Sequence, residues 1–219
     1  MPKTTFVNLD KKKQTAIEKA AVTEFAAYGF HGARLNHIVE AAGIAKGSFY
    51  QYFEDLSDLY FHLLDSFSKR KMELIQQELD KHQGDGFFDK YRLVLETSSR
   101  FLARISEDAR RVCEHLPSSR DIDSRRLTRL RKQSEENVYK PLIAEAIRKG
   151  EIIRDADFAL AIVTSTSGMI RQYLTSKTGT AKLRRVYRDG KLLDDAIDRF
   201  VDFLRVGLTS ISVEGDSRR

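Results

Sequence analysis

The sequence predicts an all-α fold, and three observations support this prediction. The 219 residues include only three prolines and 12 glycines, so long helices meet few residues that would interrupt them. Apolar residues recur in most segments at the spacing of an amphipathic helix. No run of residues shows the alternation of apolar and polar side chains that is typical of a strand.

The composition indicates a globular chain in a reducing compartment. Hydrophobic residues make up 41% of the sequence, which argues against an extended disordered chain. Cys113 is the single cysteine, so no disulfide can form within the chain. The sequence has no signal peptide and no apolar run of about 18 residues, which a membrane span needs. We therefore expect a cytoplasmic protein that does not enter a membrane.

The N-terminal elements follow from periodicity and glycines. Residues 1–10 lack periodicity, and we expect a loose arm there. The next segment begins with three lysines and carries an apolar helical face, which consists of Ile17, Ala20, Ala21 and Phe25. Gly29 and Gly32 end this helix, and Gly29 is suited to a left-handed C-cap.

Two short helices and one long helix come next. The short ones are predicted around Leu35–Ala42 and at Ala45–Tyr52, with Gly43 in the turn between them. Asp55 can cap the long helix, and Asp58 stands three residues later in the capping-box position. This helix runs to about residue 81 and spans roughly 40 Å, so it can connect two bodies.

The remaining chain is predicted to be a helical domain. The segment His82–Gly86 is the clearest linker. Beyond it we expect helices near residues 87–105, 107–114, 120–149, 155–177 and 191–212. The predicted organisation is a three-helix domain at residues 1–54, a connecting helix at 55–81 and a larger C-terminal domain at 82–219.

The two short helices with the glycine turn form the pattern of a helix-turn-helix. In this motif the second helix lies in the major groove of DNA, and the first crosses the phosphate backbone. The major groove admits one α-helix and presents a distinct pattern for each base pair. The formal net charge of +6 fits a polyanionic partner, although such an excess alone is weak support for one.

Residues 41–59, with the sequence AAGIAKGSFYQYFEDLSDL, resemble the signature of the tetracycline-repressor (TetR) family. The run from Ile17 to Gly32 also resembles this family, because its small, aromatic and glycine residues occur in the expected order. The resemblance covers about residues 13–60. It implies a homodimer, an all-α C-terminal domain and commonly a small-molecule inducer.

Candidate DNA contacts gather on the second short helix and in the segments before it. They are Lys46, Gly47, Ser48, Tyr50, Gln51, Tyr52, Arg34, Asn36 and Lys13. A cation at Lys46 opposes the helix dipole, which favours a phosphate contact over a structural role. Gly47 costs roughly 1 kcal/mol of helix propensity relative to Ala, and it would let the backbone approach DNA closely. Gln51 can pair bidentately with adenine.

Other interpretations compete with these contacts. Ser48 can be an ordinary residue of the first helical turn, and the rings of Tyr50 and Tyr52 can pack in part on the core while their hydroxyls contact phosphate. We assign four residues to the core of this domain, namely Phe25, Ile38, Phe49 and Phe53.

The chain departs from the family pattern in its caps. Arg34 and Leu35 stand where the first short helix usually begins with Thr or Ser, and Ala45 replaces a capping Ser. Leu56 replaces the usual Lys at the start of the long helix, and Glu54, Asp55 and Asp58 make this edge acidic. DNA affinity can then depend more on Lys11, Lys12 and Lys13, for which a solvated helix start is a close alternative.

The last two long helices are the predicted dimer interface. The expected contact residues are Gly168, Leu193, Ile197, Phe200, Val201, Leu204 and Leu208. Two such helices from each subunit could form a four-helix bundle, although the same stripe fits an intrachain core. A dimer would place two recognition helices about 34–36 Å apart and would read a palindromic site on double-stranded DNA.

An effector cavity is expected among the helices at 87–149 and 155–177. Its candidate lining residues are Phe101, Arg104, Cys113, His115, Tyr139, Thr164 and Tyr173, and ordinary packing or exposure is the alternative for each. No second cluster with ligand spacing accompanies Cys113 and His115, so we expect neither a metal nor another cofactor. The basic stretches Arg125–Lys132 and Lys182–Lys191 are expected to be solvated surface, with distal DNA or an acidic partner as the lesser alternative.

These patterns lead to one main hypothesis about function. It is a DNA-binding transcription regulator, a repressor that a small-molecule effector releases from DNA, with the long helix as the lever. The alternative is a DNA-bound adaptor that recruits a protein partner and needs no small molecule. We expect no enzyme, because the sequence contains no P-loop, GxSxG or HExxH motif.

Overall fold

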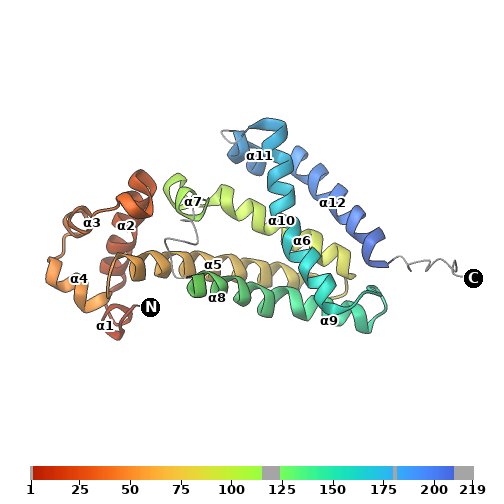
Figure 1. The fold of residues 1–219 in the computed structure, drawn as a ribbon, viewed down its shortest axis with the longest axis horizontal. Coiled ribbons are helices and arrows are strands. Elements are labelled where there is room, and N and C mark those ends of the chain that lie inside the picture. The colour runs from red at the N-terminus through yellow and green to blue at the C-terminus, as the bar shows by residue number, and fades with distance from the viewer. Residues whose placement is uncertain (1, 115–123, 180–181, 210–219) are drawn as a thin grey trace, which may run out of the picture. The chain divides into compact units, whose positions relative to one another are not determined.

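A computed structural model describes residues 2–114, 124–179 and 182–209 (Figure 1). Secondary structure in these ranges is helical and includes no strand, which confirms the predicted all-α fold. The chain divides into two compact units. Unit 1 consists of Met1–Arg70 and Arg104–Arg131, and unit 2 consists of Lys71–Ala103 and Lys132–Arg219. Of the helices in the described ranges, none is long and apolar enough to cross a membrane.

Unit 1 is a cluster of short helices around an aromatic core. Its helices are α1 (Thr4–Val7), α2 (Lys11–Gly32), α3 (Leu35–Ala41), α4 (Lys46–Tyr52), the first part of α5 (Leu56–Lys81), α7 (Glu107–Glu114) and most of α8 (Ser124–Ser134). The four residues assigned to this core from the sequence are all buried. Gly29 interrupts α2 with the positive φ of 68° that a glycine at a helix end adopts, although its ψ of 178° is extended and differs from the expected left-handed cap.

The expectation of a loose arm at residues 1–10 is wrong. Residues Thr4–Val7 form the helical turn α1, and the Phe6 side chain is only 2% exposed. Phe6 is the one fully buried side chain of this segment, and one ring does not produce a periodic pattern in the sequence.

The chain does not divide at residue 82, where the C-terminal domain was expected to begin. Helix α7 belongs to unit 1, because Val112 is buried in its core and accepts a hydrogen bond from the Tyr60 hydroxyl at 3.3 Å. Helix α8 adds Arg126, whose guanidinium lies 3.3 Å from the buried Asp58 carboxylate and stacks over the Phe61 ring. Arg126 is therefore not the solvated surface cation that the sequence suggested.

Unit 2 packs its helices on a larger apolar core. It contains the end of α5, α6 (Phe87–Arg104), a π-helical segment (Glu135–Tyr139), α9 (Lys140–Arg148), α10 (Ala156–Thr178), α11 (Leu183–Asp189) and α12 (Lys191–Thr209). The Tyr91 hydroxyl donates a hydrogen bond to the Val163 carbonyl at 2.7 Å, which joins α6 to α10 inside this core.

Helix α11 was not predicted, since its segment was expected to be solvated. Leu183 and Tyr187 are buried one helical turn apart, while Lys182, Arg185 and Arg188 are exposed. The many cations of this segment mask its helical pattern in the sequence, although Leu183, Tyr187 and the partly buried Val186 pack on the core of unit 2. The expected solvated surface therefore holds for one face of the segment alone.

Candidate DNA-binding surface

The turn between α3 and α4 is built on Gly43. This residue has φ 65°, and the Gly43 N–H donates to the Glu40 carbonyl at 3.1 Å. The Ile44 N–H donates to the Val39 carbonyl at 3.0 Å, which completes a Schellman motif. The sharp reversal that the sequence predicted at this glycine therefore has a defined hydrogen-bond pattern.

Helix α4 is anchored on one face and open on the other. Phe49 and Phe53 are fully buried, which agrees with their assignment to the core. Lys46, Gly47 and Gln51 are exposed, and the Tyr50 side chain is 48% exposed. A Cβ at Gly47 would have no neighbour within 4 Å, so packing within unit 1 does not require a glycine there.

The two other candidates on α4 lie at the margin of this face. Ser48 and Tyr52 are half-buried, and the Tyr52 ring meets the Phe6 ring edge-on at a centroid distance of 6.1 Å. Ala45, the N-cap of α4, provides no capping side chain, as its apolar side chain predicts. Ser48 and Tyr52 are thus partly packed in unit 1 and partly accessible to solvent.

Helix α3 takes its N-terminal cap from α2. Arg34 and Asn36 are exposed, and the Arg34 side chain does not cap the helix. The buried Glu24 carboxylate accepts the Arg34 N–H at 2.8 Å and lies 3.0 Å from His37 Nδ1. Glu24 was not among the residues predicted from the sequence. Its carboxylate on the apolar stripe of α2 nevertheless indicates a buried charge that needs a partner.

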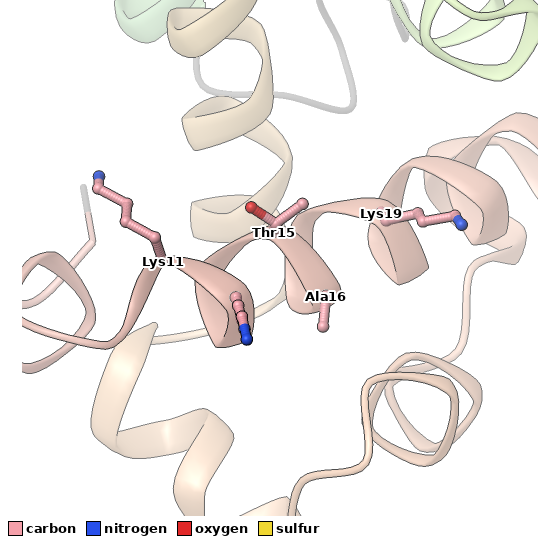
Figure 2. A pocket seen from close by; sticks show the side chains of 5 residues that line it. Lys11, Thr15, Ala16 and Lys19 are labelled. Carbon is pink, nitrogen blue, oxygen red and sulfur yellow. The ribbon is translucent and has the colours of Figure 1, made fainter.

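A row of lysines covers the solvent face of α2. Lys11, Lys12 and Lys19 surround a shallow hollow of about 430 Å³ together with Thr15 and Ala16, most of which Figure 2 shows. Lys11 Nζ donates to Gln14 Oε1 at 3.0 Å. Lys13 is exposed as well but does not line this hollow. The surface therefore adds Lys19 to Lys11, Lys12 and Lys13, the lysines that the sequence suggested as contacts to an anion.

The edge at the start of α5 is less acidic than its sequence implies. Glu54 and Asp55 are exposed, whereas Asp58 is fully buried and paired with Arg126. The Asp58 N–H donates to Asp55 Oδ1 at 2.7 Å, so Asp55 caps α5 as predicted.

The predicted effector residues are divided between the two units. Phe101, Tyr139, Thr164 and Tyr173 belong to unit 2, whereas Arg104 and Cys113 fall in unit 1. His115 lies outside the described residues. The Thr164 hydroxyl donates to the Leu160 carbonyl at 2.8 Å, and burial raises the pKa of Tyr139 above its ordinary value.

The predicted dimer stripe on α12 faces the interior of unit 2. Its buried members are Leu193, Ile197, Val201, Leu204 and Leu208, which all belong to the core of unit 2, while Phe200 is half-buried beside Tyr173. The intrachain alternative therefore holds for these five residues. Gly168 is exposed on α10.

Large apolar side chains remain exposed on the other face of these helices. Phe203 and Val206 of α12 are 72% and 64% exposed, and Phe158 and Met169 of α10 are each about half exposed. Within the described ranges, no group of three or more His, Cys, Asp or Glu side chains could hold a metal ion.

Comparison with known proteins gives a match in unit 1. The family model described as bacterial regulatory proteins of the tetR family matches residues 17–63. The uncharacterized HTH-type transcriptional regulator YdgC of Bacillus subtilis is 38% identical over 61 residues, which cover 28% of this chain and 31% of YdgC. The HTH-type transcriptional regulator RutR of Escherichia coli K12 is 42% identical over 52 residues, which cover 24% of each chain. The matched segments thus span less than a third of these relatives.

Solved structures extend the likeness to the whole fold. A TetR family transcriptional regulator from Chloroflexus aurantiacus has a TM-score of 0.61 at 23% identity, and the match covers 95% of this chain and 98% of that one. The transcriptional regulator FadR from Bacillus subtilis, solved in complex with stearoyl-CoA, has a TM-score of 0.66 at 18% identity over 84% of this chain and 97% of its own. Residues 17–63 of this chain therefore match the tetR family of bacterial regulatory proteins, and its fold is similar to that of solved TetR-family regulators.

Proposed function

We propose that this chain is a sequence-specific DNA-binding transcription regulator that acts as a homodimer on a palindromic site in double-stranded DNA. The observation that carries the proposal is the division of α4 into two faces. Phe49 and Phe53 fix the helix to unit 1, and the edge with Lys46, Tyr50 and Gln51 is open to solvent. An exposed helix that follows a tight glycine turn has the geometry needed to enter a major groove.

The side chains on this edge supply two kinds of contact. Gln51 can form a bidentate pair with adenine and carries base recognition. Lys46, Ser48, Tyr50 and Tyr52 contact phosphates, and Gly47 lets the backbone come close to the DNA. Arg34 and Asn36 of α3 and Lys13 of α2 add phosphate contacts from outside the recognition helix.

Dimerisation is best supported by the exposed apolar face of α10 and α12. Phe203, Val206, Phe158 and Met169 would lose their contact with water if two copies packed these helices together. The small residue Gly168 lies exposed among them and permits close helix approach. We therefore replace the five buried members of the expected stripe by this exposed face and retain Phe200 and Gly168. The replaced residues are Leu193, Ile197, Val201, Leu204 and Leu208.

We further propose that the protein is a repressor released by a small molecule bound in unit 2. The FadR structure of the same fold contains stearoyl-CoA, which supports an effector in this class of fold without defining its chemistry here. The effector must bind one dimer conformation better than the other, because equal affinity would shift nothing. Helix α5 begins in unit 1 and ends in unit 2, so it is the candidate lever.

Selection of bound fragments from random DNA tests this function. We expect a palindromic sequence, with Lys46→Ala and Tyr50→Ala variants that bind it more weakly but remain dimeric. Glu40, which is exposed on α3, provides the control variant Glu40→Ala. Mobility-shift assays between about 50 and 200 mM salt separate sequence-specific affinity from the electrostatic, sequence-independent part of the affinity for DNA. Recovery of no preferred sequence would contradict the proposal, and dissociation of either dimer would show that the residue has another role.

A further inference from the structure

The segment Lys3–Leu9 closes the C-terminal end of α4. An α-helix leaves its last four carbonyl groups without partners inside the helix. In α4 the first of these, at Phe49, accepts the Phe53 N–H at 2.9 Å. The carbonyls of Tyr50, Gln51 and Tyr52 accept hydrogen bonds from the N-terminal segment.

Two residues of this segment provide all three donors. Lys3 Nζ donates to the Tyr50 carbonyl at 2.8 Å, and the Lys3 N–H donates to the Tyr52 carbonyl at 2.8 Å. The Thr5 hydroxyl donates to the Gln51 carbonyl. The Lys3 ammonium also places a positive charge at the negative end of the helix dipole. The end of α4 is thus capped by residues more than forty positions away in the sequence.

A buried ring and a buried amide hold the segment in place. The Phe6 ring lies 4.7 Å from the Phe53 ring and 5.1 Å from the His62 ring, measured between centroids. Gln14 Nε2 lies within 3.0 Å of the carbonyl oxygens of Phe6, Val7 and Leu9. The segment is therefore attached to α2 at one end and to α4 at the other.

This attachment matters because α4 is short. It has seven residues, whereas an isolated helix of fewer than about 12–15 residues is marginal in water. Its N-terminal end has no side-chain cap. Cap hydrogen bonds at the C-terminal end therefore contribute strongly to its conformation and to the direction of its exposed edge.

We propose that the segment Lys3–Leu9 is a clamp that positions the recognition helix, with Phe6 as the positioning residue on which the clamp depends. The proposal rests on the proposed function of α4 in binding DNA. The Lys3 ammonium acts on the protein in this arrangement and does not contact phosphate, in contrast to the exposed lysines of α2. DNA affinity is thus sensitive to residues that never touch DNA.

The test compares Phe6→Ala with Phe6→Leu, Lys3→Met and Val7→Ala in the full chain. Val7 is the matched control, because it lies on the same helical turn and is 60% exposed. The probe is the DNA fragment that the wild-type protein selects, measured beside a scrambled fragment of equal length. We expect Phe6→Ala to bind the selected fragment about tenfold more weakly, which corresponds to the loss of one base contact. Phe6→Leu should restore most of this affinity.

Two further readouts distinguish positioning from contact and from misfolding. The salt dependence of DNA binding should keep its slope in Lys3→Met, because the slope falls only when a phosphate contact is lost. Hydrogen exchange should speed up at the amides of residues 49–53 in Phe6→Ala, while the amides of α5 stay protected. Unchanged affinity of Phe6→Ala for the selected fragment, or an equal loss on the scrambled fragment, would overturn the clamp, as would a reduced slope in Lys3→Met. If the wild-type protein selects no sequence at all, the proposed function fails instead.

Discussion

Glu24 holds the beginning of α3 from inside unit 1, and its replacement by alanine should loosen that helix. The Glu24 side chain is only 7% exposed, and it accepts the Arg34 N–H at 2.8 Å. Arg34 is the N-cap residue of α3 and offers no capping side chain of its own. The carboxylate of α2 therefore makes the bond that a capping-box Glu or Gln usually makes to the N–H of the N-cap residue.

The structure sets the size of the expected effect. A buried donor that loses its partner costs about 1–3 kcal/mol, and the loss of an N-cap costs about 0.5–2 kcal/mol. These two figures describe the same hydrogen bond, so they are not added. Because Arg34 is an exposed residue, water reaches the freed N–H and reduces the penalty. We expect Glu24→Ala to lower the free energy that protects α3 from opening by about 1–2 kcal/mol.

Hydrogen exchange of the full chain measures this quantity at α3. The amides of residues 35–41 should exchange roughly 5- to 30-fold faster in Glu24→Ala, since 1.4 kcal/mol corresponds to a factor of ten. Glu24→Gln keeps one acceptor oxygen and should show a smaller effect. Glu40→Ala removes an exposed carboxylate from α3 and serves as the control. Equal exchange in the Glu24→Ala and wild-type proteins, or an equal acceleration in Glu40→Ala, would refute the capping role.

Four other substitutions should separate folding from function. Phe203→Asp should make the chain monomeric in sedimentation experiments without lowering its helix content, and a variant that remains dimeric would exclude this face as the interface. Gly43→Ala should cost about 1–2 kcal/mol of stability in thermal unfolding, because φ is 65° there. Gly47→Ala should instead raise stability by up to about 1 kcal/mol and weaken DNA binding, because a Cβ fits there and alanine favours the helix. The opposite ranking would contradict both assignments. Burial raises the pKa of Tyr91, so the folded chain keeps a proton that the unfolded chain loses above the ordinary pKa of 10.0. Stability should hold below about pH 10 and fall above it by up to about 1.4 kcal/mol per pH unit, and Tyr91→Phe should remove that part of the slope in alkaline unfolding, while an unchanged slope would show that Tyr91 does not cause it.

The helix-turn-helix could be predicted because its determinants are local. Gly43 marks a left-handed turn, and Phe49 and Phe53 are four residues apart on one face of a short helix. Each of these signals lies within about ten residues, so neither long-range contacts nor the position of another helix can reverse them. The resemblance to the TetR family, predicted from this same segment, is confirmed for residues 17–63 by the family model.

Faces that depend on tertiary contacts could not be predicted in the same way. Helix α12 is apolar around more than one face, and periodicity alone does not say which face is turned inward. Leu204 is buried in unit 2, whereas its neighbour Phe203 is exposed. Helices α1 and α11 were missed for a related reason, because each is held by only one or two buried side chains. Such short segments contain no more than about two periods of the helical pattern, which is too few to indicate a helix.

A stricter use of the same pattern would have found the polar groups that organise unit 1. Gln14 and Glu24 lie on the apolar stripe of α2, and Asp58 lies on the buried side of α5. A buried polar or charged group is costly unless it is paired, so each of these side chains should have a defined partner. The partners are the carbonyls at the end of α1, the N–H of Arg34 at the start of α3, and Arg126 of α8.

Apolar contacts alone would allow short helices to slide or rotate on one another. These directional bonds fix where α1 and α3 end or begin, and through the cap that α1 provides, they also fix the end of α4. A variant that keeps every apolar residue and replaces Gln14 by leucine should therefore retain a packed core and still lose the alignment of the edge that Lys46 and Gln51 present.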